Sequence, residues 1–295
     1  PPLMRRLPSP KRASRFPPSL FAAALLLAGC GQAGPEAPPP LPEAALAAVS
    51  ADPGVGREAL ARAVDALFSR DAIGETRALL VLHAGEVAAE RYGEGFAADT
   101  RLIGWSMSKT VTGVLLGMMV ADGRLTLDAS APVALWQRPG DPRGEITLRQ
   151  LLQMRSGLRH QEKAEPLYDS AEVRMMFGEG RDDMAAWAEA QPLAQEPGRT
   201  FTYSTPTSVI LADIAADLIA PDAPPALRQR AMADFLHARL AVPLGMGSMA
   251  GEYDAAGTLI VADAFRGLLA VGADRQVRVL TDEAAGSPIL YADAI

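Results

Sequence analysis

A serine and a lysine three residues apart open a long apolar run, and this stretch organises the rest of the chain. The run extends from Val111 to Val120 and carries no charged side chain. If it is a helix, Ser106 and Lys109 lie one turn apart on the same face. Their hydroxyl and amine are therefore expected to project into the same space.

A serine beside a buried lysine has the parts that an acyl-transfer site needs. Burial disfavours the ammonium form of lysine, and a neutral lysine can take the proton of a serine, which makes the serine a nucleophile. The start of a helix adds free N–H groups and the positive end of its dipole. The same pattern also arises as a helix N-cap followed by a solvated lysine, so the rest of the chain must decide between the two.

Composition narrows the classes of function. The 295 residues suffice for one large domain or two closely packed ones, and the net charge of −7 argues against nucleic-acid binding. One cysteine, Cys30, and three scattered histidines give neither a disulfide framework nor the spacing of a metal site. We therefore expect no metal and no cofactor.

Residues 1–30 have the pattern of a secretory signal, in which a basic region precedes about ten apolar residues. The end of the run, Leu27-Ala28-Gly29-Cys30, resembles a bacterial lipobox. This resemblance implies cleavage before Cys30 and lipid attachment to its thiol; the alternative is an ordinary signal peptide with an incidental cysteine. Residues 31–52 are predicted to be a Pro-rich tether. The membrane is then a partner through the lipid, and the protein is exported to the periplasmic or cell-surface side of a bacterial membrane.

The remaining pattern alternates short strands with many helices. Residues 77–83 and 87–93 are predicted to pair as a β-hairpin, and Asp122-Gly123 is predicted to end the helix that follows Ser106. Thr147 is a predicted N-cap for a helix whose apolar stripe includes Met154 and which Ser156-Gly157 ends. Further helices are predicted at 57–70, 171–177, 182–190, about 208–219 and 227–240.

Five separate motifs, in this order, resemble the class C β-lactamase and penicillin-binding-protein-like serine hydrolases. The branch that they resemble most is that of the 6-aminohexanoate-dimer hydrolases and related esterases. The motifs are Ser106-Met107-Ser108-Lys109, Gly123-Arg124-Leu125-Thr126-Leu127-Asp128, Ile146 to Leu152 with Ser156-Gly157-Leu158, Pro197-Gly198 with Phe201 and Tyr203-Ser204, and Pro243-Leu244-Gly245-Met246.

The resemblance implies an α/β fold of the β-lactamase/transpeptidase type, with an antiparallel sheet flanked by helices and a mostly helical domain. It implies that Ser106 is the acylated nucleophile, that Lys109 activates it, and that Tyr203 passes a proton to the leaving group. Tyr168 and Ser204 are the implied substrate contacts. A structural role for Tyr168, packing under a loop, and for Tyr203, at the end of a strand, is the alternative.

Two departures from the family pattern qualify this expectation. The asparagine of the family's Tyr-x-Asn motif is replaced by Thr205, which disfavours β-lactam substrates and suits an esterase or amidase. The third motif, Lys-Thr-Gly or His-x-Gly, is absent, and the resemblance stops near Ile260. We therefore expect a partial domain at 53–260 that lacks the C-terminal sheet strands, and an unmatched tail at 261–295 that a frameshift would explain.

The expected function is hydrolysis of a small ester or amide, including possible 6-aminohexanoate-oligomer or β-lactam bonds, through an acyl-enzyme on Ser106. The alternative is a catalytically impaired penicillin-binding or scaffolding lipoprotein of the same fold. Residues 104–108 half-resemble the nucleophile elbow of an α/β-hydrolase, but the final glycine is missing.

Overall fold

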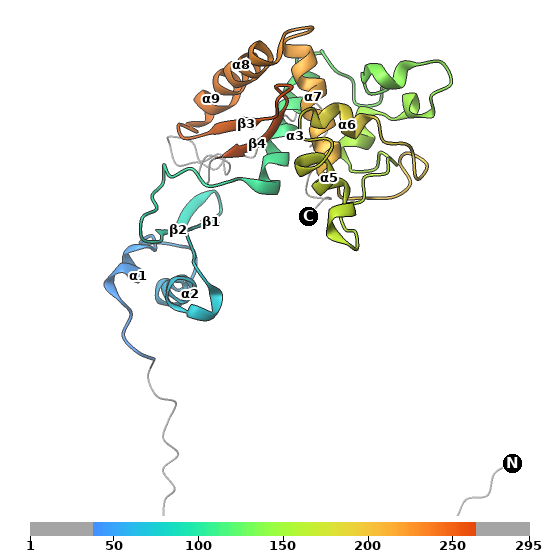
Figure 1. Ribbon diagram of the computed structural model, residues 1–295. Coiled ribbons are helices and arrows are strands. Elements are labelled where there is room, and N and C mark those ends of the chain that lie inside the picture. The colour runs from blue at the N-terminus through green and yellow to red at the C-terminus, as the bar shows by residue number, and fades with distance from the viewer. Residues whose placement is uncertain (1–37, 264–295) are drawn as a thin grey trace, which may run out of the picture. The chain divides into compact units, whose positions relative to one another are not determined.

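The computed structural model describes residues 38–263, which form mostly helices and two small sheets (Figure 1). The predicted signal peptide with Cys30, most of the predicted tether and most of the segment 261–295 lie outside these residues. Of the unit Pro1–Pro40, only residues 38–40 are described, and they form neither helix nor strand. No helix within residues 38–263 combines the length and the apolarity that crossing a bilayer requires.

The first part of the unit Leu41–Ile295 is a hairpin with two helices. Strand β1 (Ala78–His83) pairs antiparallel with β2 (Glu86–Tyr92), as predicted. Helices α1 (Glu43–Ala47) and α2 (Arg57–Ser69) share a small apolar cluster with the hairpin. The prediction that the tether extends to residue 52 is wrong for its last part, because Ala45 is buried and Val49 forms a β-bridge to Ala89.

Helix α3 (Ser108–Ala121) carries the long apolar run, and it packs against α7 (Thr205–Ile219) in the main core. Asp122 and Gly123 end α3 as predicted, with Gly123 in the left-handed conformation at a φ of +70°. Ser106 itself precedes α3, in the 3-10 helix η2 (Trp105–Met107). Ser106 and Lys109 therefore lie in two successive elements, and the tighter turn still brings residues three apart together.

Short helices surround this pair. Thr147 caps α4 (Leu148–Leu152) with a full capping box, as predicted. Helix α4 ends earlier than predicted, because Met154 adopts a φ of +55° that no helix allows. The other bounds are η1 (Asp71–Ile73), η3 (Ala134–Gln137), η4 (Pro142–Glu145), η5 (Leu167–Asp169), α5 (Ala171–Phe177), α6 (Met184–Glu189), α8 (Pro225–Leu236), the π-helix η6 (His237–Ala241) and α9 (Val242–Leu244).

A second hairpin follows the helices. Strand β3 (Ala250–Tyr253) pairs antiparallel with β4 (Leu259–Asp263), and β4 also contacts α3, α7 and η2. Each hairpin forms a two-stranded sheet of its own within the described residues. The antiparallel strands and flanking helices agree with the predicted fold class.

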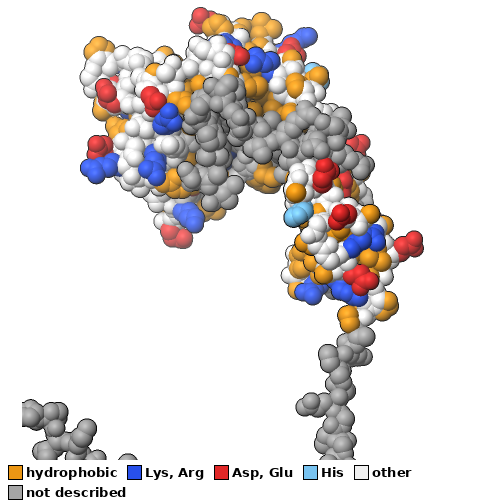
Figure 2. Space-filling view, turned by 180° about the vertical axis from the view of Figure 1, so that it is seen from behind, with side chains coloured by type: hydrophobic (Ala, Val, Ile, Leu, Met, Phe, Trp, Pro, Cys, Tyr) orange, Lys and Arg blue, Asp and Glu red, His pale blue; other side chains and the backbone are white. Residues whose placement is uncertain are grey.

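Acidic and basic side chains lie interspersed over the described surface in Figure 2. Several of them form local ion pairs, such as Arg149 with Asp128 and Arg239 with Asp122. Pairs as exposed as these contribute little to stability. The described fold therefore depends mainly on its apolar core.

Candidate active site

The hydroxyls of Ser106 and Tyr203 meet at the N-terminal end of α3. The Tyr203 hydroxyl donates a hydrogen bond of 2.6 Å to Ser106 Oγ, and Lys109 Nζ donates one of 3.4 Å to the same oxygen. Lys109 Nζ also lies 4.9 Å from the centre of the Tyr203 ring. The structure thus brings together the three side chains that the sequence predicted as catalytic.

Ser106 and Lys109 differ in how far their side chains are exposed to solvent. Ser106 is exposed, whereas Lys109 is 6% exposed. Trp105, which precedes the serine, has a φ of +44°, a conformation that is costly for a residue with a side chain. Such strain often accompanies functional turns, and here it presents Ser106 at the surface.

Local structure places Tyr203 directly before α7. Ser204 is the N-cap of this helix, and its hydroxyl accepts a hydrogen bond of 3.0 Å from the N–H of Thr207. Ser204 is also 1% exposed. Its side chain is buried and caps the helix that follows Tyr203, which favours a structural role, and contact of Ser204 with substrate stays a prediction.

Tyr168 lies on η5 and is 69% exposed. No hydrogen bond links its side chain to Ser106, Lys109 or Tyr203 within the described part of the chain. The exposure does not fit packing under a loop. Its role as a substrate contact stays a prediction.

Thr205, Glu162 and Glu172 complete the surroundings of Lys109, and sequence reasoning missed all three. Lys109 Nζ donates a hydrogen bond of 3.1 Å to Thr205 Oγ1, which in turn donates one of 3.3 Å to Glu172. The N–H of Thr205 donates to the carboxylate of Glu162. The one available signal was Thr205 itself, a hydrogen-bonding side chain at the place of the missing asparagine.

The pKa of Glu172 is displaced by its surroundings. Burial raises its pKa above the usual value, and the nearby Glu162 carboxylate raises it further. The Thr205 hydrogen bond and the charge of Lys109 act in the opposite direction. Protonation of Glu172 is therefore coupled to the groups that surround the lysine.

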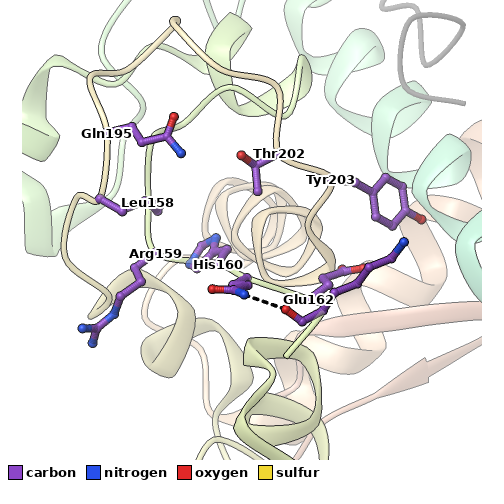
Figure 3. A pocket seen from close by; sticks show the side chains of 10 residues that line it. Leu158, Arg159, His160, Glu162, Gln195, Thr202 and Tyr203 are labelled. Atoms are coloured by element: carbon purple, nitrogen blue, oxygen red, sulfur yellow. Dashed lines mark hydrogen bonds between the residues drawn. The ribbon is translucent and has the colours of Figure 1, made fainter. Parts of the chain in front are cut away.

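A cavity of about 460 Å³ opens beside Tyr203 (Figure 3). Its lining includes Leu158, His160, Ala194 and Thr202, while Arg159 extends away from it. Burial lowers the pKa of His160 to about 4, so this ring is neutral at pH 7. Its Nε2 donates to the carbonyl of Ala188, 3.0 Å away, because that oxygen can only accept.

No group of three or more His, Cys, Asp or Glu side chains is arranged to hold a metal ion within residues 38–263.

What the site can do chemically follows from Ser106, Lys109 and Tyr203. An exposed hydroxyl stands within hydrogen-bonding distance of an amine and a phenol, the arrangement that activates a serine nucleophile.

Comparison with known proteins gives a matching family and a curated relative. Residues 65–280 match the protein family described as Beta-lactamase, a range that extends past residue 260, where the sequence motifs end. The 6-aminohexanoate-dimer hydrolase of Paenarthrobacter ureafaciens is 39% identical over 97 residues, which are 32% of this chain and 24% of that protein.

Two solved structures match part of this chain. A structure described as a 6-aminohexanoate-dimer hydrolase from Bacillus anthracis has a TM-score of 0.49 and 20% identity, covering 64% of this chain and 51% of its own. The D-amino acid amidase of Ochrobactrum anthropi SV3 has a TM-score of 0.44 and 17% identity, covering 65% and 61%. The chain thus spans about half to three-fifths of these structures' length.

Proposed function

The chain belongs to the Beta-lactamase family of hydrolases, and on this premise we propose that it is a serine hydrolase that cleaves an ester or amide bond through an acyl-enzyme on Ser106. One observation carries the proposal. The oxygen of Ser106 accepts hydrogen bonds from Tyr203 and Lys109, at 2.6 and 3.4 Å.

The proposed reaction has two stages. Ser106 Oγ attacks the substrate carbonyl while the proton of the serine hydroxyl passes to the Lys109–Tyr203 pair. The bond between the carbonyl carbon and the leaving group then breaks as Tyr203 gives a proton to the leaving group. A water molecule next attacks the acyl ester on Ser106. The same pair takes a proton from that water and returns one to Ser106 Oγ, which frees the acid.

Two features support a linear ester or amide as the substrate class. Thr205 stands where the family pattern has the asparagine that contacts β-lactam amides. The cavity beside Tyr203 has room for a substrate group and includes the apolar side chains of Leu158 and Ala194 in its wall. The named activity of the Paenarthrobacter relative, hydrolysis of an amide dimer, belongs to the same bond class.

Covalent labelling tests the proposal on the full chain. A fluorophosphonate probe is expected to label the wild type and Ser69→Ala, whose serine is exposed at the end of α2, but not Ser106→Ala. A p-nitrophenyl ester assay and a nitrocefin assay then compare the turnover of an ester with that of a β-lactam, and ester turnover is expected to dominate.

Equal circular dichroism spectra of the three proteins are the control for folding. A folded wild type that takes up neither the fluorophosphonate nor a fluorescent penicillin contradicts the proposal. A folded wild type labelled by penicillin alone supports a penicillin-binding role instead.

A further inference from the structure

Thr205 is a junction between three parts of the chain. Its hydroxyl accepts a hydrogen bond of 3.1 Å from Lys109 of α3 and donates one of 3.3 Å to Glu172 of α5. Its backbone N–H donates to Glu162, in the segment that follows α4. One side chain thus links the lysine of the site to a carboxylate that does not touch Ser106.

The structure gives both hydrogen bonds the same direction, from Lys109 through Thr205 to Glu172. An ionised carboxylate only accepts. The single hydrogen of the Thr205 hydroxyl must therefore point to Glu172, which leaves an oxygen lone pair facing Lys109. Hydrogen bonds arranged head to tail in this way reinforce one another.

Lys109 needs such a partner because its own side chain is long. An unrestrained lysine loses rotamer entropy when it is held in one place. The hydrogen bond of Lys109 to Ser106 Oγ, at 3.4 Å, is longer than a typical hydrogen bond and cannot alone fix the amine. The shorter bond to Thr205 holds Nζ from the other side.

Thr205 is itself held in place. It is the first residue of α7, where a carboxylate is favoured by the free N–H groups and the helix dipole. Glu162 supplies that carboxylate. Because Tyr203 lies two residues earlier, the same contact also anchors the segment that carries the tyrosine hydroxyl.

We propose that Thr205 and Glu172 are positioning residues, which through the chain Lys109–Thr205–Glu172 hold the lysine amine against Ser106. The inference rests on the proposed function of Ser106. It predicts that the first covalent step depends on two side chains that are not themselves in contact with the nucleophile.

The test measures the rate constant and the half-saturation concentration of fluorophosphonate labelling for the full chain. Thr205→Val keeps the shape of the side chain but removes the hydroxyl, and is expected to lower the labelling rate constant about tenfold. Half-saturation is expected to stay within about twofold, because the probe does not need Thr205 for binding. Thr205→Ser restores the hydroxyl and is expected to restore the rate.

Glu172→Gln tests the far end of the chain, with Glu179→Gln as its matched control, since Glu179 is exposed and pairs with Arg174 instead. Glu172→Gln is expected to slow labelling and Glu179→Gln to leave it unchanged. If the two positioning residues act through one chain, Thr205→Val with Glu172→Gln is no slower than Thr205→Val alone.

Each outcome has a separate meaning. If the wild type is labelled, three results overturn this inference but leave the proposed function standing. They are an unaltered labelling rate in Thr205→Val, a loss of rate that Thr205→Ser does not restore, and additive losses of rate in the double variant. An unlabelled wild type contradicts the proposed function, and with it this inference. If Thr205→Val does not give the wild-type circular dichroism spectrum, Glu172→Gln decides the matter.

Discussion

Lys109 shows at the scale of one residue how function can oppose stability. Its amine is buried in the core-facing start of α3, where a cation must be compensated by hydrogen bonds. The Thr205 and Ser106 oxygens and the Tyr203 ring provide that compensation. An apolar side chain of similar length would need none of it.

Replacing the lysine with methionine separates the two effects. Lys109→Met is expected to lower the fluorophosphonate labelling rate by about 10²–10⁴, the usual contribution of a positioned base. The free energy of unfolding in urea is expected to stay the same or to rise, since an apolar group replaces a buried amine that needs hydrogen-bond partners. A variant that is clearly less stable would show that the lysine serves the fold as well.

The pairing of Ser106 with Lys109 could be predicted from sequence for a local reason, whereas Tyr203, 97 positions from Ser106, was predicted only from the family resemblance. Ser106 and Lys109 are three residues apart, so any helical turn brings them together. Thr205, Glu162 and Glu172 were missed because their contacts join residues that are 33 to 96 positions apart. No periodicity encodes such a contact, and only the packing of α5 and α7 creates it.

At the scale of the element, α7 combines core and site. Most of its residues are buried, and its N-terminus presents Tyr203 and Thr205 to the lysine. The cap residue Ser204 connects the two tasks, because loss of the cap loosens the turn that holds both side chains.

Ser204→Ala tests whether Ser204 is a cap or a substrate contact. The variant is expected to lose about 1 kcal/mol of unfolding free energy, the usual cost of an N-cap. The half-saturation concentration of labelling is expected to stay within about twofold. Weaker probe binding with unchanged stability would support the role that the sequence predicted.

Helix and strand positions were predictable where apolar periodicity is strong, as in α2, α5 and the first hairpin. Apart from α1, which lies within the predicted tether, the errors described above fall at the ends of predicted elements. Helix α4 ends before Met154 because this residue adopts the left-handed conformation. An apolar side chain gives no sequence signal for that conformation. Ser106 lies in a 3-10 turn because the chain tightens before α3.

At the scale of the whole molecule, buried acids make stability depend on pH. Burial, together with the neighbouring carboxylates Asp213, Asp217 and Asp183, raises the pKa of Glu189 to about 8. The folded protein therefore keeps a proton that the unfolded chain releases above pH 4.5. The stabilising contribution of this proton is complete below pH 4.5 and is lost as pH rises to about 8.

Glu189→Gln removes this dependence. The variant is expected to be more stable than the wild type near pH 8, and the difference is expected to shrink toward pH 4.5, as measured by urea unfolding across that range. Glu145→Gln, which changes an exposed residue of η4, is the matched control. An equal difference at every pH would show that Glu189 does not titrate on unfolding.

The sequence distance between Ser106 and Tyr203 has a consequence for the life of the newly made chain. The two residues are 97 positions apart. A ribosome that adds about 5–20 residues per second needs about 5–20 s to cover that interval. During this time the serine has emerged without the phenol that completes its surroundings, so the nascent chain carries an ordinary hydroxyl. On the proposed function, Ser106 becomes a nucleophile only when α7 docks on α3, after the ribosome has translated the intervening residues.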